Sequence, residues 1–358
     1  MLNKFYLNNT KIVLSKESFD ILKDYIFSQS WTRIFIIIDV NTRRDCLPVL
    51  FKKIPALRKS VLIDLPEGEH VKSLEYVQFI SAKLLRQNID KESLLINLGG
   101  GVISDLGGFV ASVIKRGVSF INIPTTLMAQ VDASIGGKVA VNFLNYKNQI
   151  GVFNDPIMVF IYPGFLQSLS TNHFQHALSE IFKYGLVFDN FFWNQLTSMQ
   201  LNKKSDLYYL VLKSIVIKIN VVKLDYFDLN ERRKLNYGHT ISHAIESCFL
   251  KHKKPISHGL ALSVGLICET YISYKRFRFK KEIFDSIINR IVEVFSTIEI
   301  GNLGNNQILN YIKSDKKNSN GNYNFTLIKN IGESVVNCSV DDSEILRSLD
   351  FYKKLCQL

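Results

Sequence analysis

The chain has 358 residues, of which 47% are hydrophobic and 21% are charged. This length allows about two domains with a large buried core, and the composition excludes disordered, collagen-like and small disulfide-stapled proteins. The formal net charge of +12 suits a nucleic acid, an anionic membrane or a small anionic substrate, or else a solvated surface that reflects coding bias.

The first half of the chain alternates strand-like and helix-like segments. Short runs rich in β-branched residues predict strands at residues 33–39, 60–65, 93–98 and 119–123. Between the second and third of these strands, apolar residues recur with a helical period over residues 71–87. This alternation is typical of βαβ units and predicts a parallel sheet.

The pattern changes from about residue 166 onward. Helical periodicity covers residues 178–186, 207–224, 237–249 and 259–274. Strand-like runs return only at 324–328 and 334–338. We therefore expect an α/β domain with a Rossmann-like parallel sheet over residues 1–165, and a mainly α-helical domain over residues 166–358.

A glycine-rich turn follows the strand predicted at 93–98. Gly99, Gly100 and Gly101 lead into a helix-like segment that begins near Ser104. A strand, a glycine turn and a helix together bring backbone N–H groups and a helix N-terminus to a phosphate. The spacing is GGGxxxD and differs from the GxGxxG dinucleotide fingerprint. Phosphate binding and a tight turn without a ligand both remain open on spacing alone.

Histidines and one glutamate form a candidate metal site. His239 and His243 are four residues apart on one helical face, His258 lies 19 residues after His239, and Glu180 precedes Lys183 by one turn. Imidazole and carboxylate groups are natural Zn²⁺ ligands. The spacing allows three histidine ligands, or one histidine of the pair on the metal and the other on a substrate, or ordinary structural histidines. The other histidines have polar neighbours and are expected at the surface. They are His70, His173, His176 and His252.

Several cations lie beside glycines or within apolar segments. They are Arg116, Lys138, Lys147, Lys183, Lys218 and Arg232. A lysine in an apolar run must extend to water or form a pair. Gathered in one cleft, these cations would neutralise a substrate that carries both phosphate and carboxylate. Taken singly, each is an ordinary solvated charge.

Cysteine usage and hydropathy indicate the cellular compartment of the protein. The five cysteines are scattered singly without a CxxC pair, which favours reduced thiols. The N-terminus lacks the apolar core of a signal peptide, and no apolar run approaches the roughly 20 residues of a membrane helix. We expect a cytoplasmic protein without a membrane partner.

Seven segments resemble the 3-dehydroquinate synthases, which belong to the sugar phosphate cyclase group. The segments are LPEGEHVKSL (65–74), NLGGGVISDLGGFVAS (97–112), RGVSFINIPTTLMAQVDASIGGKVAVN (116–142), KNQIGVF (147–153), SEIFKYGLV (179–187), LNYGHTISHAIES (235–247) and SHGLAL (257–262). They occur in the family's order at near-family spacing, and the resemblance extends from about residue 30 to residue 340.

The resemblance implies a dehydroquinate synthase-like fold, a bound NAD, one divalent metal (zinc, with cobalt as the second choice) and a homodimer. It implies a lyase that converts 3-deoxy-D-arabino-heptulosonate 7-phosphate to 3-dehydroquinate and phosphate. This reaction is the second step of the shikimate pathway, which leads to chorismate and the aromatic amino acids. The implied route is transient oxidation by NAD, phosphate elimination, re-reduction and an intramolecular aldol closure.

The resemblance also implies roles for individual residues. The metal ligands would be Glu180, His239 and His258, which leaves His243 for the substrate phosphate. The NAD contacts would be Asp39, Asn41, Glu67, Gly68, Glu69, His70, Val71, Lys72, Gly100, Gly101, Val102, Ile103, Ser104, Asp105, Thr125, Thr126, Asp132, Lys138, Lys147, Phe165, Leu166, Gln167 and Ser168. The substrate contacts would be Arg116, Lys138, Asn148, Lys183, Lys218, Arg232, Asn236, His243 and either Lys316 or Lys317. Of these, Lys138, Lys183, Lys218, Arg232 and His243 would serve catalysis.

Some positions depart from the family pattern. Leu260 replaces the carboxylate that the family carries two residues after the third ligand, in the string His258-Gly259-Leu260-Ala261. Lost support of this kind weakens metal affinity or activity by about 10–100-fold. We therefore expect an active but less robust enzyme. The remaining departures are Ser104, Val139, Ser242 and the run DYFD at 225–228.

Three other functions compete with this interpretation. Another sugar phosphate cyclase would act on a substrate without a carboxylate, whereas Arg232 and Lys218 are both basic here. A metal-dependent polyol dehydrogenase commonly has Asp as its first ligand, whereas this chain has Glu180. A nucleic-acid binder would need a recognisable motif or clustered lysines, and the sequence has neither. We expect no nucleic-acid partner.

Overall fold

The computed structural model describes residues 1–144, 146–202, 206–254, 256–300, 303–313 and 323–357. Contacts group the chain into two compact units, one of residues 1–170 with 206–223 and the other of residues 171–205 with 224–358. The domain boundary predicted at 165/166 stays a prediction, and this grouping assigns residues 206–223 to the first unit. In the part of the chain that the structure describes, no helix has the length and apolarity needed to cross a membrane.

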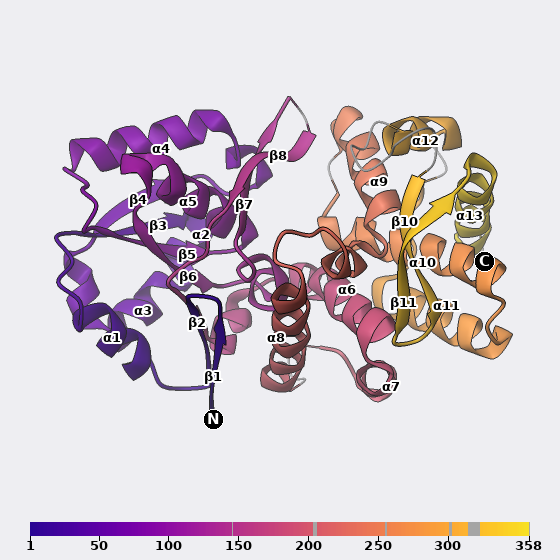
Figure 1. Ribbon diagram of the computed structural model, residues 1–358, viewed down its shortest axis with the longest axis horizontal. Coiled ribbons are helices and arrows are strands. Elements are labelled where there is room, and N and C mark those ends of the chain that lie inside the picture. The colour runs from indigo at the N-terminus through magenta and orange to yellow at the C-terminus, as the bar shows by residue number, and fades with distance from the viewer. Residues whose placement is uncertain (145, 203–205, 255, 301–302, 314–322, 358) are drawn as a thin grey trace. The chain divides into compact units, whose positions relative to one another are not determined.

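A seven-stranded sheet forms the centre of the first unit (Figure 1). Its strand order is β1-β2-β9-β6-β5-β3-β4, and all neighbours are parallel except β1 and β2. The strands are β1 (Leu2–Leu7), β2 (Thr10–Ser15), β3 (Ile34–Asp39), β4 (Val61–Leu65), β5 (Leu94–Gly99), β6 (Ser119–Pro124) and β9 (Met158–Ile161).

Helices cover both faces of this sheet because its strands bury side chains alternately on the two sides. Ile36 and Ile38 of β3 pack in one core with α1 and α3, whereas Phe35 and Ile37 pack in another core with α4 and α5. The helices of this unit are α1 (Asp20–Phe27), α2 (Val40–Asp45), α3 (Leu47–Lys53), α4 (Leu74–Arg86), α5 (Gly101–Val113) and α8 (Leu207–Leu224). The result is a three-layer α/β/α arrangement.

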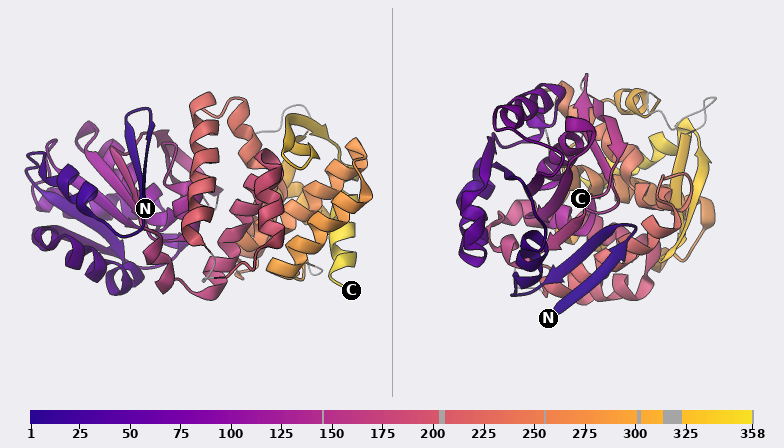
Figure 2. Two further views of the ribbon diagram at one scale, coloured as in Figure 1. Left: turned by 90° about the horizontal axis from the view of Figure 1, so that it is seen from below. Right: turned by 60° about the vertical axis from the view of Figure 1, so that its left-hand side comes forward.

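Two hairpins in the first unit were not predicted from the sequence. Strands β1 and β2 form the indigo hairpin beside the N-terminus (Figure 2). Strands β7 (Lys138–Phe143) and β8 (Tyr146–Phe153) form a separate two-stranded sheet. The four strands that the sequence predicted for the first half of the chain correspond to β3, β4, β5 and β6, and the predicted helix at 71–87 corresponds to α4.

The second unit is mainly helical. Its helices are α6 (Thr171–Phe188), α7 (Asn190–Ser198), α9 (His239–Lys251), α10 (His258–Phe277), α11 (Lys281–Phe295), α12 (Asn305–Lys313) and α13 (Asp342–Leu355), and its hairpin is β10 (Tyr323–Asn330) with β11 (Glu333–Val340). Helix α10 is central, because it packs against α6, α9, α11, α13 and β10. The two units together confirm the predicted fold class.

Candidate metal centre and nucleotide turn

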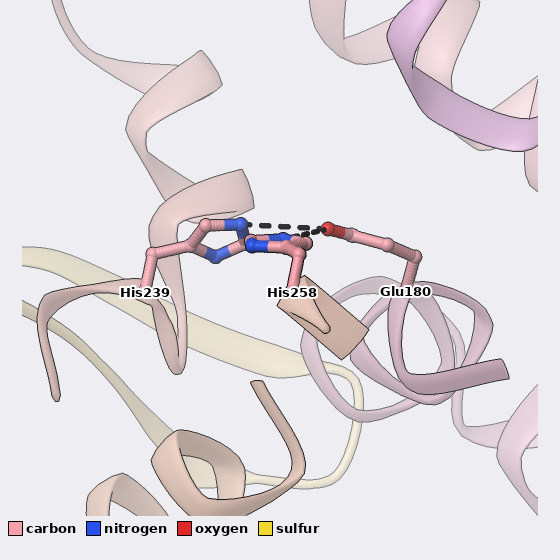
Figure 3. A group of neighbouring side chains, drawn as sticks. All are labelled: Glu180, His239 and His258. Atoms are coloured by element: carbon pink, nitrogen blue, oxygen red, sulfur yellow. Dashed lines mark hydrogen bonds and ion pairs between the residues drawn. The ribbon is translucent and has the colours of Figure 1, made fainter. Parts of the chain in front are cut away.

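Three side chains of the second unit converge on one point. Oε1 of Glu180, from α6, lies 3.4 Å from Nε2 of His239 and 3.3 Å from Nε2 of His258. The two imidazole rings face the carboxylate from the first residues of α9 and α10 (Figure 3). One ligand atom from each residue falls within 4.8 Å of the others. A carboxylate with two imidazoles is a donor set that fits Zn²⁺ or a similar divalent ion.

The charges around this group hold two of the three side chains in the protonation state that binds a metal. Glu180 and Lys183 form an ion pair in which each side chain is 1% exposed. Burial by itself raises the pKa of Glu180, but the charge of Lys183 and the two imidazoles outweigh burial and hold that pKa well below its usual range. Burial, and next the charge of Lys183, lower the pKa of His239. The ionised carboxylate and the neutral imidazole are the forms that bind a metal.

His258 behaves differently from His239. Burial alone would lower the pKa of His258, but the carboxylates of Glu246 and Glu180 outweigh burial and raise this pKa to about 9. Without a metal, His258 is therefore protonated at neutral pH. A divalent cation must displace that proton in order to bind Nε2.

Two glycines of α10 bring the helices close enough for the ligands to meet. A Cβ atom on Gly259 would lie 1.9 Å from the carbonyl oxygen of His176 in α6. A Cβ atom on Gly265 would lie 1.9 Å from the carbonyl oxygen of Gly238, the residue before His239. Any larger residue at either position would push α10 away from a helix that carries another ligand.

The start of α9 is also held by a buried carboxylate. Glu269 of α10 is 0% exposed and accepts hydrogen bonds from the backbone N–H groups of Gly238 (2.7 Å) and Ile241 (3.4 Å). Negative charge at a helix N-terminus satisfies unpaired N–H groups and interacts favourably with the helix dipole. Glu269 thereby fixes the position from which His239 extends.

His243 lies beside the three ligands in a second group. Its ring centroid is 5.3 Å from that of His239 and 6.0 Å from that of His258. Ligand atoms of His243, Glu246 and His258 also fall within 4.8 Å of one another. In this second group Oε2 of Glu246 faces Nδ1 of His258, at 3.3 Å. The two groups therefore approach opposite nitrogens of the same imidazole.

A short loop of the second unit holds Arg232. The side chain of Asp225 accepts hydrogen bonds from the backbone N–H groups of Leu229, Asn230 and Arg232. Burial tends to raise the pKa of Asp225, but these N–H groups lower it. Arg232 is 3% exposed and donates from Nη1 to the carbonyl oxygen of Tyr226, at 2.6 Å. The DYFD segment, although it departs from the family pattern, therefore anchors a predicted substrate residue.

The glycine turn of the first unit has the geometry that the sequence indicated. Strand β5 ends at Gly99, and α5 begins at Gly101 after Gly100. No side chain in the described part of the chain caps this helix. A Cβ atom on Gly107 would lie 2.0 Å from Oδ1 of the buried Asn97, so α5 packs directly on the sheet. The uncapped N-terminus of a 13-residue helix fits a phosphate group.

Residues predicted for NAD and for substrate meet in one hydrogen-bonded network near this turn. Nζ of Lys72 contacts Oδ2 of Asp105 at 2.5 Å and also the side-chain oxygen of Asn148. Burial raises the pKa of Asp105 even though Lys72 opposes it. Asn142 donates to Glu69 at 2.9 Å and accepts from the backbone N–H of Asn148 at 3.0 Å. Helix α5 and the β7–β8 hairpin are thereby connected through polar side chains.

The other predicted residues are dispersed through both units. Asp39 caps α2 by accepting from Asn41 and Thr42, and Asn41 donates to Glu67. Lys218, on α8, pairs with Asp132 at 2.6 Å. The rest lie near β4 (Gly68, His70, Val71), in the first turn of α5 (Val102, Ile103, Ser104), before β6 (Arg116), after β6 (Thr125, Thr126), on the β7–β8 hairpin (Lys138, Lys147), at residues 163–168 (Phe165, Leu166, Gln167, Ser168) and before α9 (Asn236).

The placement of Phe165 and Leu166 limits what these residues can do. The side chains of Phe165 and Leu166 are buried, so only their backbone is available to a ligand. Lys316 and Lys317 lie outside the described residues.

Sequence reasoning missed several residues around the metal group. Glu246 and Glu269 were not singled out, although Glu246 follows His243 by three residues on a helix, a spacing that places the two on one face. Away from this group, Asp225 was noted only as part of the DYFD departure from the family pattern. His176 was expected at the surface, which is wrong. It is partly buried and its Nδ1 lies 2.7 Å from Oγ of Ser257, the residue that caps α10.

Solved structures of two enzymes share this fold over nearly the whole chain. One is 2-deoxy-scyllo-inosose synthase, solved with carbaglucose-6-phosphate, NAD⁺ and Co²⁺, with a TM-score of 0.84 at 19% identity and 99% coverage of both chains. The other is 2-epi-5-epi-valiolone synthase from Streptomyces hygroscopicus subsp. jinggangensis 5008, solved with NAD⁺ and Zn²⁺ bound, with a TM-score of 0.84 at 21% identity and the same coverage. The fold is therefore dehydroquinate synthase-like.

Sequence comparison narrows this class to one family. The chain matches the 3-dehydroquinate synthase N-terminal family over residues 62–176 and the corresponding C-terminal family over residues 177–318. A 3-dehydroquinate synthase from Parabacteroides distasonis is 36% identical over 350 residues, which cover 97% of this chain and 99% of the relative. The chain belongs to the 3-dehydroquinate synthase family and is an enzyme of the carbon–oxygen lyase class. The resemblance seen in its motifs is confirmed.

Proposed function

We propose that the chain converts 3-deoxy-D-arabino-heptulosonate 7-phosphate to 3-dehydroquinate and phosphate, with NAD and one divalent metal as cofactors. The observation that carries this proposal is the convergence of Glu180, His239 and His258 within 4.8 Å in a chain of this family. The glycine turn before α5 supports the same proposal, because it offers backbone N–H groups to a pyrophosphate.

The cofactors would divide the chemistry between them. NAD, when bound, supplies the hydride acceptor and donor, and the metal, when bound, supplies a Lewis acid for substrate hydroxyl groups. Glu180, His239 and His258 would hold the metal. Gly100 and Gly101 would face the NAD pyrophosphate from the start of α5.

The chain's own residues set the charge of each cofactor site. Lys183 keeps Glu180 ionised, and burial keeps His239 neutral, so both present lone pairs to a cation. Lys72 is held by Asp105 and brings positive charge to the nucleotide end. These buried pairs preorganise the site before any ligand binds.

The predicted substrate cations would bind the two anionic ends of the substrate. Arg232 is permanently charged and suits a carboxylate, which it can bind through two parallel hydrogen bonds. Tyr226 orients its guanidinium. Lys138, Lys183, Lys218, Asn148, Asn236 and His243 would complete the set. Holding both ends fixes the conformer that reacts, and the substrate's own phosphate would take the proton during elimination.

The finer assignments of location and assembly belong to this proposal. The chain would act in the cytoplasm as a homodimer on a small phosphorylated acid, without nucleic-acid or membrane partners. Light scattering after gel filtration tests the dimer, because a mass near the 41.0 kDa of one chain would contradict it.

The decisive experiment is phosphate release from the heptulosonate phosphate in the presence of NAD and Zn²⁺, with and without a chelator. We expect release that a chelator abolishes and that added Zn²⁺ or Co²⁺ restores. The variants Glu180→Ala and His258→Ala should lose release under all metal concentrations. Absence of release with every metal would overturn the proposed activity, whereas normal release by both variants would overturn only the metal site.

A second candidate is another cyclase of the same fold. Parallel assays with a glucose phosphate and a heptulose phosphate that lack the carboxylate would separate the two. We expect no turnover of either, because Arg232 and Lys218 are retained as buried cations.

A further inference from the structure

Glu246 approaches one of the proposed metal ligands from the side away from the metal group. It lies on α9 seven residues, or about two turns, after His239, and its side chain is 5% exposed. Its Oε2 atom is 3.3 Å from Nδ1 of His258, while Nε2 of the same ring is 3.3 Å from Oε1 of Glu180. The imidazole of His258 is thus held at both nitrogens, by carboxylates from two different helices.

The geometry points to Glu246 as the positioning residue of the metal centre: its carboxylate accepts a hydrogen bond from Nδ1 of His258 and so directs the Nε2 lone pair at the metal. An imidazole has one protonated nitrogen and one lone pair when it is neutral, and the hydrogen bond at one nitrogen determines which atom is free to bind. A carboxylate on the far nitrogen also makes the ring more basic and fixes its orientation.

The position of Glu246 in the fold makes this role specific. Helix α9 supplies His239 from its first residue and Glu246 from two turns further on, so one rigid helix holds a ligand and the support of another ligand. Helix α10 begins at His258, between these two side chains, with Ser257 as its cap. The close approach of α10 to the start of α9 at Gly265 and Gly238 brings Glu246 and His258 within reach of each other.

Glu246 also changes the expectation attached to Leu260. The family pattern led us to expect weaker support for His258, because Leu260 replaces a carboxylate. In the structure the carboxylate on Nδ1 comes from α9, and Leu260 serves the start of α10 by donating its backbone N–H to Ser257 at 3.3 Å. The support of His258 in this chain therefore does not depend on position 260.

The inference rests on the metal of the proposed function, so its test measures metal binding without NAD, substrate or turnover. The full chain is stripped with a chelator, and Zn²⁺ affinity is measured by competition with a chromophoric chelator. The variants are Glu246→Gln, which keeps an acceptor but removes the charge, and Glu246→Leu, which removes both. Glu282→Gln, at an exposed position of α11, is the control with the same change in charge.

We expect Glu246→Gln to bind Zn²⁺ about 10-fold more weakly and Glu246→Leu up to about 100-fold more weakly, with the control unchanged. A second readout separates positioning from stability. In the Co²⁺-loaded protein, the visible d–d spectrum should change for both Glu246 variants, while circular dichroism of the metal-free Glu246→Gln protein stays that of the original chain. If Glu246→Leu does not fold, the Glu246→Gln variant alone tests the role of Glu246.

If both variants retain the Zn²⁺ affinity and the Co²⁺ spectrum of the original chain, the role of Glu246 is overturned. The proposed function still stands in that case. A change in stability alone, with metal affinity retained, would overturn the role of Glu246 in the same way. If the original chain binds neither Zn²⁺ nor Co²⁺, the metal of the proposed function fails, and the role of Glu246 fails with it.

Discussion

Some charged side chains of the second unit are buried, and their partners lie close to them. Glu180 and Lys183 are three residues apart on α6, both side chains are 1% exposed, and they form an ion pair. An ion pair in such a place gains little stability over apolar residues, but the loss of one partner leaves a charge that water cannot solvate. The pair is better understood as part of a ligand site than as a stabilising contact.

Removal of the lysine charge should therefore destabilise the metal-free protein. In Lys183→Met, the carboxylate of Glu180 loses its buried cation, and we expect the free energy of unfolding to fall by about 3–5 kcal/mol. The measurement is urea unfolding in the presence of a chelator. Zn²⁺ should recover part of the loss, because a bound cation would again neutralise Glu180.

The double variant Glu180→Gln/Lys183→Met is the matched control for this prediction. It contains neither charge, so it should be more stable than Lys183→Met alone. A single variant that unfolds within about 1 kcal/mol of the original chain would show that water reaches Glu180.

Residue types and spacing were enough to identify the candidate ligands but not their geometry. The histidines at 239, 243 and 258 and the glutamate at 180 were recognisable as metal-binding types. The choice of nitrogen on His258, and the presence of Glu246 behind it, depend on contacts between residues 12 and 78 positions apart. Such contacts leave no periodic signal in a sequence.

At the level of elements, three helices must pack closely for the ligands to meet. Gly265 of α10 contacts the backbone of Gly238 directly before α9, and Gly238 adopts a φ of +81°. Glycine suits both positions. Gly265 leaves no room for a Cβ atom, and Gly238 has a left-handed backbone that disfavours larger residues.

We expect Gly265→Ala to separate α9 from α10. Alanine ordinarily stabilises a helix interior by about 1 kcal/mol relative to glycine, but the clash with the Gly238 carbonyl should reverse the sign and cost about 1–3 kcal/mol. Zn²⁺ affinity should fall too, because His239 follows Gly238. Thermal unfolding and Zn²⁺ competition measure the two effects.

Ser286→Ala, at an exposed position of α11, provides the comparison for a small substitution on a helix of the same unit. Its stability should stay within about 0.5 kcal/mol of the original chain. If Gly265→Ala were instead more stable than the original chain, the close contact between α10 and Gly238 would not exist in solution.

The sequence predicted some elements and missed others for a physical reason. Strands β3 and β5 are buried on both faces by helices, so they appear as continuous apolar runs. In the β7–β8 hairpin, β7 is a short strand in which only Val139 and Val141 are buried, and β8 is partly exposed along its length without a clear alternation. Such strands form because a partner strand and neighbouring side chains are available, which local propensity does not encode.

At the scale of the whole molecule, the three proposed ligands belong to one of the two units. Glu180, His239 and His258 all lie within residues 171–205 and 224–358, whereas the glycine turn lies within residues 1–170. Each cofactor should therefore stabilise mainly the unit that holds its binding residues.

Hydrogen exchange followed by mass spectrometry can separate these effects. Zn²⁺ at 100 times its dissociation constant should stabilise its site by about 2.7 kcal/mol, with the largest gain in amide protection around residues 176–184, 237–247 and 256–264. NAD should instead protect residues 97–106. His258→Ala should abolish the Zn²⁺ response and keep the NAD response. If Zn²⁺ protected the glycine turn of that variant as strongly as NAD does, the assignment of the ligands would be contradicted.

The net charge of +12 divides into two populations in the structure. Lys183, Lys218 and Arg232 are 1%, 5% and 3% exposed, and they contact Glu180, Asp132 and the carbonyl oxygen of Tyr226. We propose that these buried cations serve the substrate. Cations such as Lys281 pair at the surface with partners one turn away, where the contribution to stability is small. The total charge by itself therefore carries little functional information.

The sequence by itself determined the apolar runs of the sheet, the glycine turn before α5, the chemical types of the metal ligands and, through seven ordered motifs, the family. Local patterns were sufficient for these features because each depends on the types and spacing of residues that are close together in the chain. Only the tertiary structure decided that residues 206–223 group with the first unit, that Glu246 supports His258 and that Glu269 fixes the start of α9. These contacts join distant segments, and their geometry depends on how the helices pack.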